Sequence, residues 1–326
     1  MKIYKVVRLA AVAAASAASI LSCAISAAQP WPVKPVRIIV PFGPGGGNDI
    51  QGRLLGKKFF ESMGQTFIVD NRSGASGLIG AELVARSPAD GYTILFTSGG
   101  LSARVSLYKK IAFDAVKDLQ PIGRVSSYPL ILVAHPSVPV KSAKELVALV
   151  KKQKGKFSAG HSGSGGPSHF SLEMLKQIAG LDVVAVPYKG AGPAIMALIT
   201  GETDFVFVPA LVAEPHFKSG RVRPLAVTSL KGSSAFPDLP TMDSIYRGFE
   251  IENWYAMFVP AGTHREIVTK LNAEMVKALK SSDVREFIAK EGGEPVGSTP
   301  EELAAYFKRE VEKYARIIKA GNITAD

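Results

Sequence analysis

The chain has 326 residues, of which 47% are hydrophobic and 21% are charged, and this composition excludes a disordered or fibrous protein. The length exceeds what one hydrophobic core usually serves, so two domains are expected. The formal charge of +11 either steers anionic ligands toward the protein or is ordinary surface basicity. Basic residues are scattered rather than gathered with aromatic residues in one stripe, so the sequence does not favour binding to nucleic acid.

The first residues have the pattern of a signal peptide. A basic segment at 1–8 precedes an apolar run at 9–25, and small residues at 26–28 offer cleavage after Ala28. A membrane anchor is disfavoured because no basic stop-transfer cluster follows the run. An Ile-Leu-Ser-Cys motif ending at Cys23 offers lipidation as another route. Both routes lead out of the cytoplasm, to an expected location in the periplasm, and removal of the three basic leader residues leaves a charge of +8.

Few residues suit catalysis or metal binding. Cys23 is the only cysteine, so the mature chain lacks both a disulfide and a thiolate nucleophile. The chain has 5 histidines, of which no two have the spacing of a helical zinc site. No Gly-x-Ser-x-Gly elbow is present. The sequence therefore predicts no catalytic residue, no metal and no cofactor.

From residue 36 onward, β-branched runs alternate with glycine-rich turns and amphipathic segments, which predicts strand, loop and helix units around a mostly parallel sheet. The predicted strands are 36–40, 66–70, 92–97, 130–134, 183–186, 205–208, 225–228 and 255–259. The predicted helices are 49–62, one that ends at 86, and then 141–152, 168–178, 265–280 and 301–319. A serine opens 141–152 and 168–178 as a predicted N-cap. No linker separates the domains, so the chain is expected to cross between them on structured segments.

Four loops lead from a strand directly into a helix: 41–49, 73–77, 160–168 and 187–193. At a helix start several backbone N–H groups are unpaired, and the helix dipole favours negative charge. Glycines in these loops allow close approach to the backbone, and serines add hydroxyl donors. One such loop alone is often only a helix cap. Four of them, two in each half of the chain, predict a carboxylate bound between two domains.

Alternatives remain open at several positions. A nucleotide is disfavoured because the first loop lacks the Lys-Ser/Thr of a P-loop and Pro44 interrupts the dinucleotide spacing. His161, in the third loop, either donates to a ligand carboxylate or makes a structural hydrogen bond. Asp204 either faces the cleft, where it favours a ligand amine or orients loop amides, or caps a turn. Phe42 and Tyr188 either stack on a flat ligand or line the pocket wall.

Eight segments carry a resemblance to a known family: 40–46, 70–81, 88–93, 186–190, 225–229, 237–241, 259–263 and 299–302. They read VPFGPGG, DNRSGASGLIGA, PADGYT, VPYKG, LAVTS, PDLPT, VPAGT and TPEE. In this order they resemble the Bug family, the periplasmic solute-binding components associated with tripartite tricarboxylate transporters. The resemblance covers nearly the whole mature chain.

The resemblance implies an α/β protein with the type II periplasmic-binding-protein fold, in which two α/β domains close on a ligand in the cleft between them. Domain I is expected to comprise 31–124 and 252–326, and domain II 125–251, with the chain crossing near Arg124 and Glu252. Loops one and two would form one wall of the cleft, and loops three and four the other. The expected ligand-binding residues are Phe42, Gly45, Gly46, Asn48, Asp49, Ala75, Ser76, Ser98, His161, Ser162, Gly163, Ser168, Tyr188, Lys189 and Asp204.

The function expected from the resemblance is capture of a small carboxylate or a related small molecule by domain closure. A monomer would present it to the membrane subunits of a tripartite tricarboxylate transporter or to a sensor, since only a state-dependent surface can report occupancy. Ser73, Ser76, His161 and Gly166 depart from the family pattern, and we expect His161 to help select the ligand. The alternatives are an exported enzyme acting on a small carboxylated substrate, which would turn its ligand over, and an interaction module without a small ligand.

Overall fold

The computed structural model describes residues 31–108, 111–217 and 219–324. The predicted signal peptide and Cys23 lie outside the described residues. By its internal contacts the chain divides between Val33 and Lys34, and all the described helices and strands belong to the part that begins at Lys34. No described helix is both long enough and apolar enough to cross a lipid bilayer.

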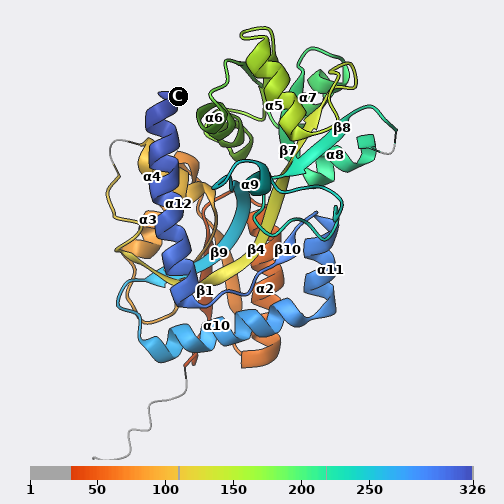
Figure 1. The fold of residues 1–326 in the computed structure, drawn as a ribbon. Coiled ribbons are helices and arrows are strands. Elements are labelled where there is room, and N and C mark those ends of the chain that lie inside the picture. The colour runs from red at the N-terminus through yellow and green to blue at the C-terminus, as the bar shows by residue number, and fades with distance from the viewer. Residues whose placement is uncertain (1–30, 109–110, 218, 325–326) are drawn as a thin grey trace, which may run out of the picture. The chain divides into compact units, whose positions relative to one another are not determined.

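Strand β4 (Leu119–Ala134) joins two groups of strands (Figure 1). Its first part, 119–129, pairs with β9, and its last part, 130–134, pairs with β7 and β8. The first group comprises β1 (Val36–Val40), β2 (Phe67–Asn71), β3 (Thr93–Ser98), β9 (Glu252–Pro260) and β10 (Glu294–Pro295). The second comprises β5 (Ser158–His161), β6 (Val184–Pro187), β7 (Phe205–Pro209) and β8 (Arg223–Val227). The described strands thus form one sheet in the order β2-β1-β3-β9-β4-β7-β5-β6, with β8 and β10 attached to β4.

The prediction of a mostly parallel sheet is wrong for its centre. β1 runs parallel to β2 and β3, and β5 runs parallel to β6 and β7. The pairings of β9 with β3 and β4, and of β4 with β7 and β8, are antiparallel. Parallel neighbours need a crossover that returns the chain to the same end of the sheet. β4 and β9 instead carry the chain from one group to the other and back, so they run in opposite directions.

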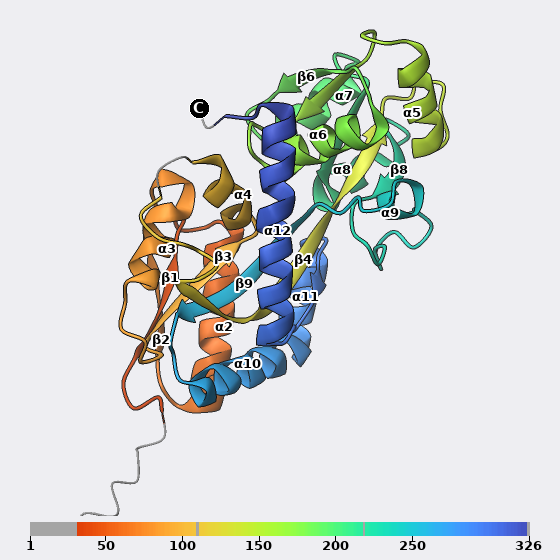
Figure 2. The same ribbon diagram turned by 60° about the vertical axis from the view of Figure 1, so that its left-hand side comes forward.

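Helices cover both faces of each group (Figures 1 and 2). The helices of the first group are α2 (Gly47–Met63), the short 3-10 helix η1 (Ala75–Gly77), α3 (Leu78–Ala85), α4 (Gly100–Leu107), α10 (Arg265–Lys280), α11 (Ser282–Lys290) and α12 (Pro300–Gly321). Those of the second group are α5 (Ala143–Lys152), α6 (Pro167–Ala179), α7 (Ala191–Ile199), α8 (Ala210–Phe217) and α9 (Met242–Ile245).

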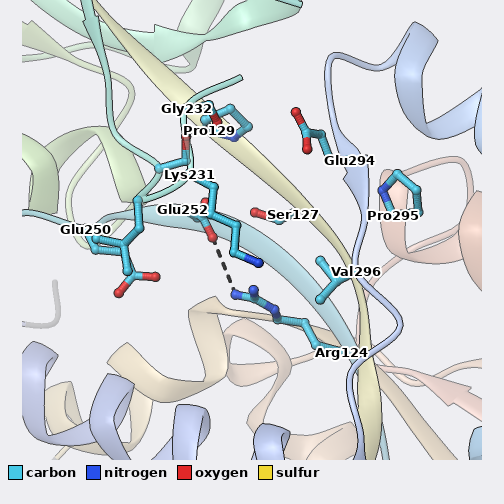
Figure 3. Close-up of a pocket in the computed structure, with 12 residues that line it drawn as sticks. Arg124, Ser127, Pro129, Lys231, Gly232, Glu250, Glu252, Glu294, Pro295 and Val296 are labelled. Atoms are coloured by element: carbon cyan, nitrogen blue, oxygen red, sulfur yellow. Dashed lines mark hydrogen bonds and ion pairs between the residues drawn. The ribbon is translucent and has the colours of Figure 1, made fainter. Parts of the chain in front are cut away.

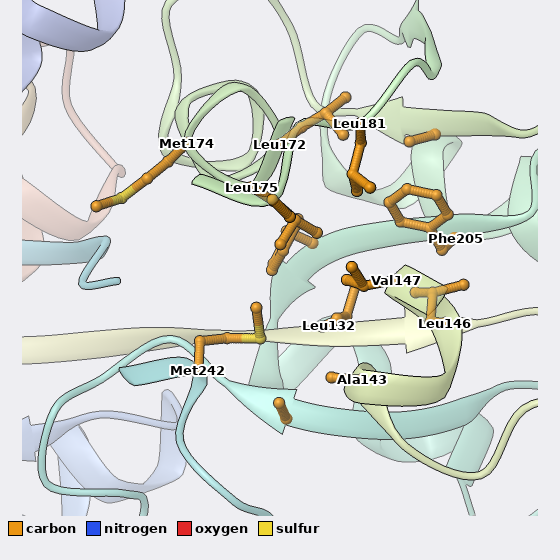
Figure 4. Packing of buried hydrophobic residues seen from close by; sticks show 14 of the residues in the cluster. Leu132, Ala143, Leu146, Val147, Leu172, Met174, Leu175, Leu181, Phe205 and Met242 are labelled. Carbon is orange, nitrogen blue, oxygen red and sulfur yellow. The ribbon is translucent and has the colours of Figure 1, made fainter. Parts of the chain in front are cut away.

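Alternate residues of β4 and β7 serve two hydrophobic clusters on opposite faces of the second group. Leu132 and Phe207 belong to the cluster under α5 and α6 (Figure 4), whereas Ile131 and Val208 belong to the cluster under α7 and α8. Successive side chains of a strand point to opposite faces. A strand that is covered on both sides is therefore apolar at every position, and this explains the uninterrupted apolar runs.

Helix α12 contributes to both groups. Its first half places Leu303 and Phe307 in a cluster with Trp254 of β9. Its second half places Tyr314 against Phe170 of α6, with ring centroids 4.7 Å apart. Figure 2 shows α12 running past β9 and β4 toward α6. Packing of α12 therefore depends on how the two groups are arranged.

Most predicted elements are confirmed within a few residues, and α10 matches at both ends. Ser142 caps α5 as predicted, since its side chain accepts a hydrogen bond from the Glu145 N–H. The predicted serine cap of α6 is wrong. This helix begins at Pro167 with Gly166 as the N-cap residue, and Ser168 Oγ instead donates to the Phe207 carbonyl at 2.5 Å. Proline is favoured in the first turn because it lacks an N–H, and so it moves the helix start one residue earlier.

We expect Leu132→Ala to lower the free energy of unfolding by about 2–5 kcal/mol, because it opens a cavity in the cluster under α5 and α6. Leu132 is fully buried, whereas Leu230 is 47% exposed. The matched control Leu230→Ala should change the free energy by less than about 0.5 kcal/mol. Urea unfolding followed by circular dichroism measures both. Equal effects of the two substitutions would contradict the assigned core.

Candidate ligand-binding site

The predicted loops lie at two edges of the sheet. Loop one (41–46) follows β1, loop two (72–77) follows β2, and α4 follows β3. Because these three strands are parallel, their carboxyl ends meet at one edge. Loop three (162–166) follows β5, loop four (188–190) follows β6, and α8 follows β7, so these three meet at the second edge for the same reason.

Residues from both edges line one cavity of about 220 Å³. Ser76 of loop two and Ser164 and Gly165 of loop three face it. The remaining lining residues are Arg104 and Leu107 of α4, Tyr108, which caps the end of α4, and Thr324. We call this the α4 cavity. It brings together parts of two predicted walls that are 88 residues apart in sequence, counted from Ser76 to Ser164.

Asp49 organises loop one from within. Its carboxylate accepts hydrogen bonds from the Gly45 N–H at 2.9 Å and from Asn71 Nδ2 at 3.0 Å, and it pairs with Arg53 at 2.9 Å. The hydrogen bond from Arg53 and those from Gly45 and Asn71 lower the pKa of Asp49 to about 2, against the opposing effect of burial. Its acceptors are occupied by the loop itself, so Asp49 positions the loop rather than offering free oxygens to a ligand.

Gly45 of loop one and Gly47, the first residue of α2, face a second cavity, of about 340 Å³. They line it together with Tyr128 and Tyr255, and across from them lie Pro209 and the first turn of α8. A Cβ atom at Gly47 would lie 2.5 Å from the Tyr255 hydroxyl, so only glycine fits there. Among the expected residues of this region, Gly46 is the N-cap of α2, and Asn48 is buried with no hydrogen-bond partner for its Oδ1.

Loop two holds two residues in left-handed backbone geometry. Ala75 has φ +43° and Ser76 has φ +56°, conformations that side-chain-bearing residues seldom adopt and that cost free energy. Ser76 Oγ lies 3.3 Å from the Tyr108 hydroxyl. Ser98, at the end of β3, is buried next to the same edge. The strained turn thus directs the Ser76 hydroxyl toward α4.

His161 lies beneath loop three. Its side chain is 3% exposed, and its ring stacks on that of His169 at 4.3 Å. His169 Nδ1 in turn accepts the Gly165 N–H at 3.1 Å. Burial lowers the pKa of His161, and the backbone of Gly163 and the charge of Glu173 oppose this effect. Ser162 and Gly163 remain half-buried in the loop, so His161 acts on the loop from below through His169.

Tyr188 of loop four and Asp204 make hydrogen bonds to other residues of the second group. The Tyr188 hydroxyl donates to Glu202 at 2.7 Å, and burial together with Glu202 raises the pKa of Tyr188 to about 12. Lys189 is exposed. Asp204 accepts the Ser158 N–H at 2.7 Å, which places it at the amino end of β5, the opposite end from loop three. This position fits the turn-capping alternative for Asp204.

The predicted list omitted the residues that α4 and β9 bring to the cavities, above all Arg104, Tyr108 and Tyr255. One signal for Arg104 was present in the sequence. It is the only charged residue of α4, which otherwise reads as small, apolar or hydroxyl-bearing residues directly after a strand end.

A third cavity, of about 210 Å³, lies where β4 and β9 pass between the groups (Figure 3). Arg124 pairs there with Glu252 at 3.4 Å, and its guanidinium lies 4.2 Å over the Tyr306 ring. Burial raises the pKa of Glu252, and the charge of Arg124 opposes this effect. Lys231 and Glu250 also line this crossing cavity. The two residues at the predicted crossing points are therefore linked by an ion pair.

Comparison with known proteins assigns the class. The family model described as tripartite tricarboxylate transporter family receptor matches residues 52–323. The chain belongs to this family and is a solute-binding protein with a mixed α/β fold, which confirms the predicted fold class and the resemblance.

Among its relatives is the protein BugT of Bordetella pertussis, 35% identical over 90% of each chain. A protein encoded between tcbD and tcbE in Pseudomonas sp. strain P51 is 34% identical over 91% of this chain and 89% of its own.

Three solved structures show the same fold. A Rhodopseudomonas palustris protein with adipate is 33% identical, with a TM-score of 0.70 over 90% of this chain and 99% of its own. MatC of the same species with bound malate is 30% identical, with a TM-score of 0.66 over 88% of this chain and 100% of its own. A TctC solute-binding protein from Polaromonas with no ligand is only 26% identical, yet its TM-score is 0.81 over 89% of this chain and 99% of its own.

We expect Asp49→Asn to lower the free energy of unfolding at pH 7 by about 1–2 kcal/mol, a value reduced for solvent screening because Arg53 is 53% exposed. The carboxyl pKa is depressed in the folded state. The stabilisation is therefore complete above about pH 4 and is lost as the pH falls toward 2. Urea unfolding at pH 7 and pH 2.5 measures this. The exposed control Asp182→Asn should show little effect, and a difference for Asp49→Asn that is as large at pH 2.5 as at pH 7 would contradict the assignment.

Proposed function

We propose that the chain captures a small carboxylate between its two groups of strands and presents it to a membrane partner. The observation that carries this proposal is the α4 cavity, because Ser76 and Ser164 face it from loops that belong to different groups. A ligand bound there contacts both groups at once. Its binding energy can then hold them in one arrangement.

The chemistry of the loops supports a carboxylate. Loops one and three lead into α2 and α6 with glycine at the N-cap, so neither cap side chain occupies the N–H groups of the first turn. These N–H groups and the helix dipole favour an anion. The basic charge of the chain acts in the same direction at longer range. Adipate and malate in the two related structures are ligands of those proteins, and they guide the choice of probes for this one.

We further propose that the two groups of strands correspond to two domains that close on the ligand. The predicted boundaries, 31–124 with 252–326 and 125–251, fall within β4 and at the start of β9. The pairing of β4 changes from β9 to β7 between 129 and 130, five residues after the predicted boundary. The greater likeness to the ligand-free relative than to the adipate and malate complexes supports an open arrangement. Closure would change the crossing cavity, where Arg124 and Glu252 meet.

The family supports a periplasmic location and a role as a transport receptor. We propose that the chain reaches the periplasm through its predicted leader, works as a monomer, and docks in its closed state on transporter membrane subunits or a sensor. The comparisons lend no support to the alternative of an exported enzyme.

A thermal-shift screen of residues 29–326 against mono-, di- and tricarboxylates, aromatic acids and acidic amino acids tests the proposal. A ligand at 100 times its dissociation constant adds about 2.7 kcal/mol, which corresponds to a shift of several degrees. We expect a clear shift for at least one carboxylate, and recovery of that compound unchanged by mass spectrometry. Chemical conversion of the compound would instead favour the alternative that the chain is an exported enzyme. Mass spectrometry after denaturation shows whether the purified protein already carries a ligand. If it carries none and no compound raises the melting temperature, the proposal that the chain binds a carboxylate is refuted.

His161→Ser should weaken binding of the best carboxylate several-fold, because it removes the ring that supports His169 and loop three. The substitution should also flatten the pH dependence of stability. The pKa of His161 is lowered in the folded state, so its stabilisation is present above its unfolded pKa of about 6.5 and is lost as the pH falls below it. Calorimetry and thermal melting between pH 5 and 8 measure these effects, with the exposed His264→Ser as control. Unchanged affinity and an unchanged pH profile would contradict a role for His161 in ligand binding.

A further inference from the structure

Arg104 lies at the same edge of the first group of strands as loops one and two. Helix α4 follows β3 after a single residue, and Arg104 stands one turn into this helix. Its guanidinium lies over Gly100, where a Cβ atom would clash with it. The ring of Phe42 from loop one is 5.6 Å away. Glycine at 100 thus leaves room for the guanidinium, which lies near the Phe42 ring and beside the α4 cavity that Arg104 lines.

This guanidinium is half-buried and has no carboxylate partner among residues 31–108, 111–217 and 219–324. Burial lowers its pKa, and the nearby Tyr108 opposes this effect. Other shielded cations of the same chain are paired: Arg124 with Glu252, and Lys313 with Glu310. Proteins rarely shield a charge from water without a partner, because the loss of hydration is costly.

The surroundings of Arg104 suit an incoming anion. The residues that line the α4 cavity include no acidic side chain, and three of its neutral hydroxyl groups belong to Ser76, Tyr108 and Ser164. Loop three comes close to α4 here, since a Cβ atom at Gly165 would lie 3.3 Å from Leu107. An anion on Arg104 would therefore have the second group of strands within reach.

We propose that Arg104 receives a carboxylate of the ligand and links it across the α4 cavity to loop three. This inference rests on the proposed function and defines its ligand class: the ligand carries an ionised planar carboxylate at the end that meets α4. A guanidinium presents two parallel N–H donors that match the two carboxylate oxygens, whereas an ammonium group cannot make this paired contact. The ligand supplies the counter-charge that the described protein residues do not.

Isothermal titration calorimetry of residues 29–326 tests the inference with adipate, malate and the best carboxylate of the thermal-shift screen. Arg104→Gln should weaken binding about 10- to 100-fold, the loss expected for a hydrogen-bonded charge pair. Arg104→Lys, which keeps the charge but not the fork, should fall between Arg104→Gln and the wild type. The control Arg285→Gln removes one exposed positive charge from α11, which lies away from α4 in Figures 1 and 2, and should bind like the wild type.

Thermal melting without ligand separates recognition from a structural role. Arg104→Gln should melt at or above the wild-type temperature, because it removes a half-buried charge that has no acidic partner among the described residues. If both Arg104 variants melt lower and lose affinity together, Arg104 is structural and the inference is overturned.

The outcomes also separate the inference from the proposed function. Unchanged affinity of Arg104→Gln, beside clear binding by the wild type, overturns the inference and leaves the carboxylate function standing. If the wild type binds no carboxylate, the proposed function fails and the inference fails with it.

Discussion

The backbone pairing of β4 is the constraint on which the rest of the structure depends. One strand pairs with β9 along most of its length and with β7 and β8 at its end, so both groups of strands are built on the same hydrogen-bonded ladder. The two edges that carry the glycine loops can then lie near each other, although neither group contains the whole site. Because β9 returns the chain beside β4, the connection is double, and α12 adds a third link through Tyr306 and Tyr314.

The loops are held by the protein's own groups, and this leaves few of their polar atoms for a ligand. The Asp49 carboxylate, the Ser168 hydroxyl and the Tyr188 hydroxyl each have a partner within the chain. Such internal bonds restrict the backbone conformation of loops one and four. A rigid loop loses less conformational entropy on binding, so the groups that are left free bind more strongly. The half-buried Arg104 of α4, which has no acidic partner among the described residues, is such a group beside the loops.

Much of the fold was predictable from local pattern. Apolar runs mark strands such as β1, β3 and β7, and amphipathic spacing marks α10 and α12. The loops were also predictable, because glycine and proline between a strand and a helix have a local steric meaning. The antiparallel centre of the sheet was not predictable in this way, since pairing partners far apart in sequence leave no local mark. Nor was the start of α6, where a proline outweighed the serine cap.

Local sequence pattern was enough to predict the class of protein, the four loops and most of the longer strands and helices, but not α4, α11 or β10. The predicted features follow from side-chain periodicity, turn chemistry and motif order, all of which act over a few residues. Only the tertiary structure decided which loop atoms are free. Asp49 turned inward to Gly45 and Arg53, His161 lay beneath its loop against His169, and Asp204 lay at the far end of β5. Arg104 became a recognition candidate because folding placed a charge beside the α4 cavity with no acidic neighbour lining it. Whether a polar group finds a partner within the protein depends on distances between segments, which no local pattern encodes.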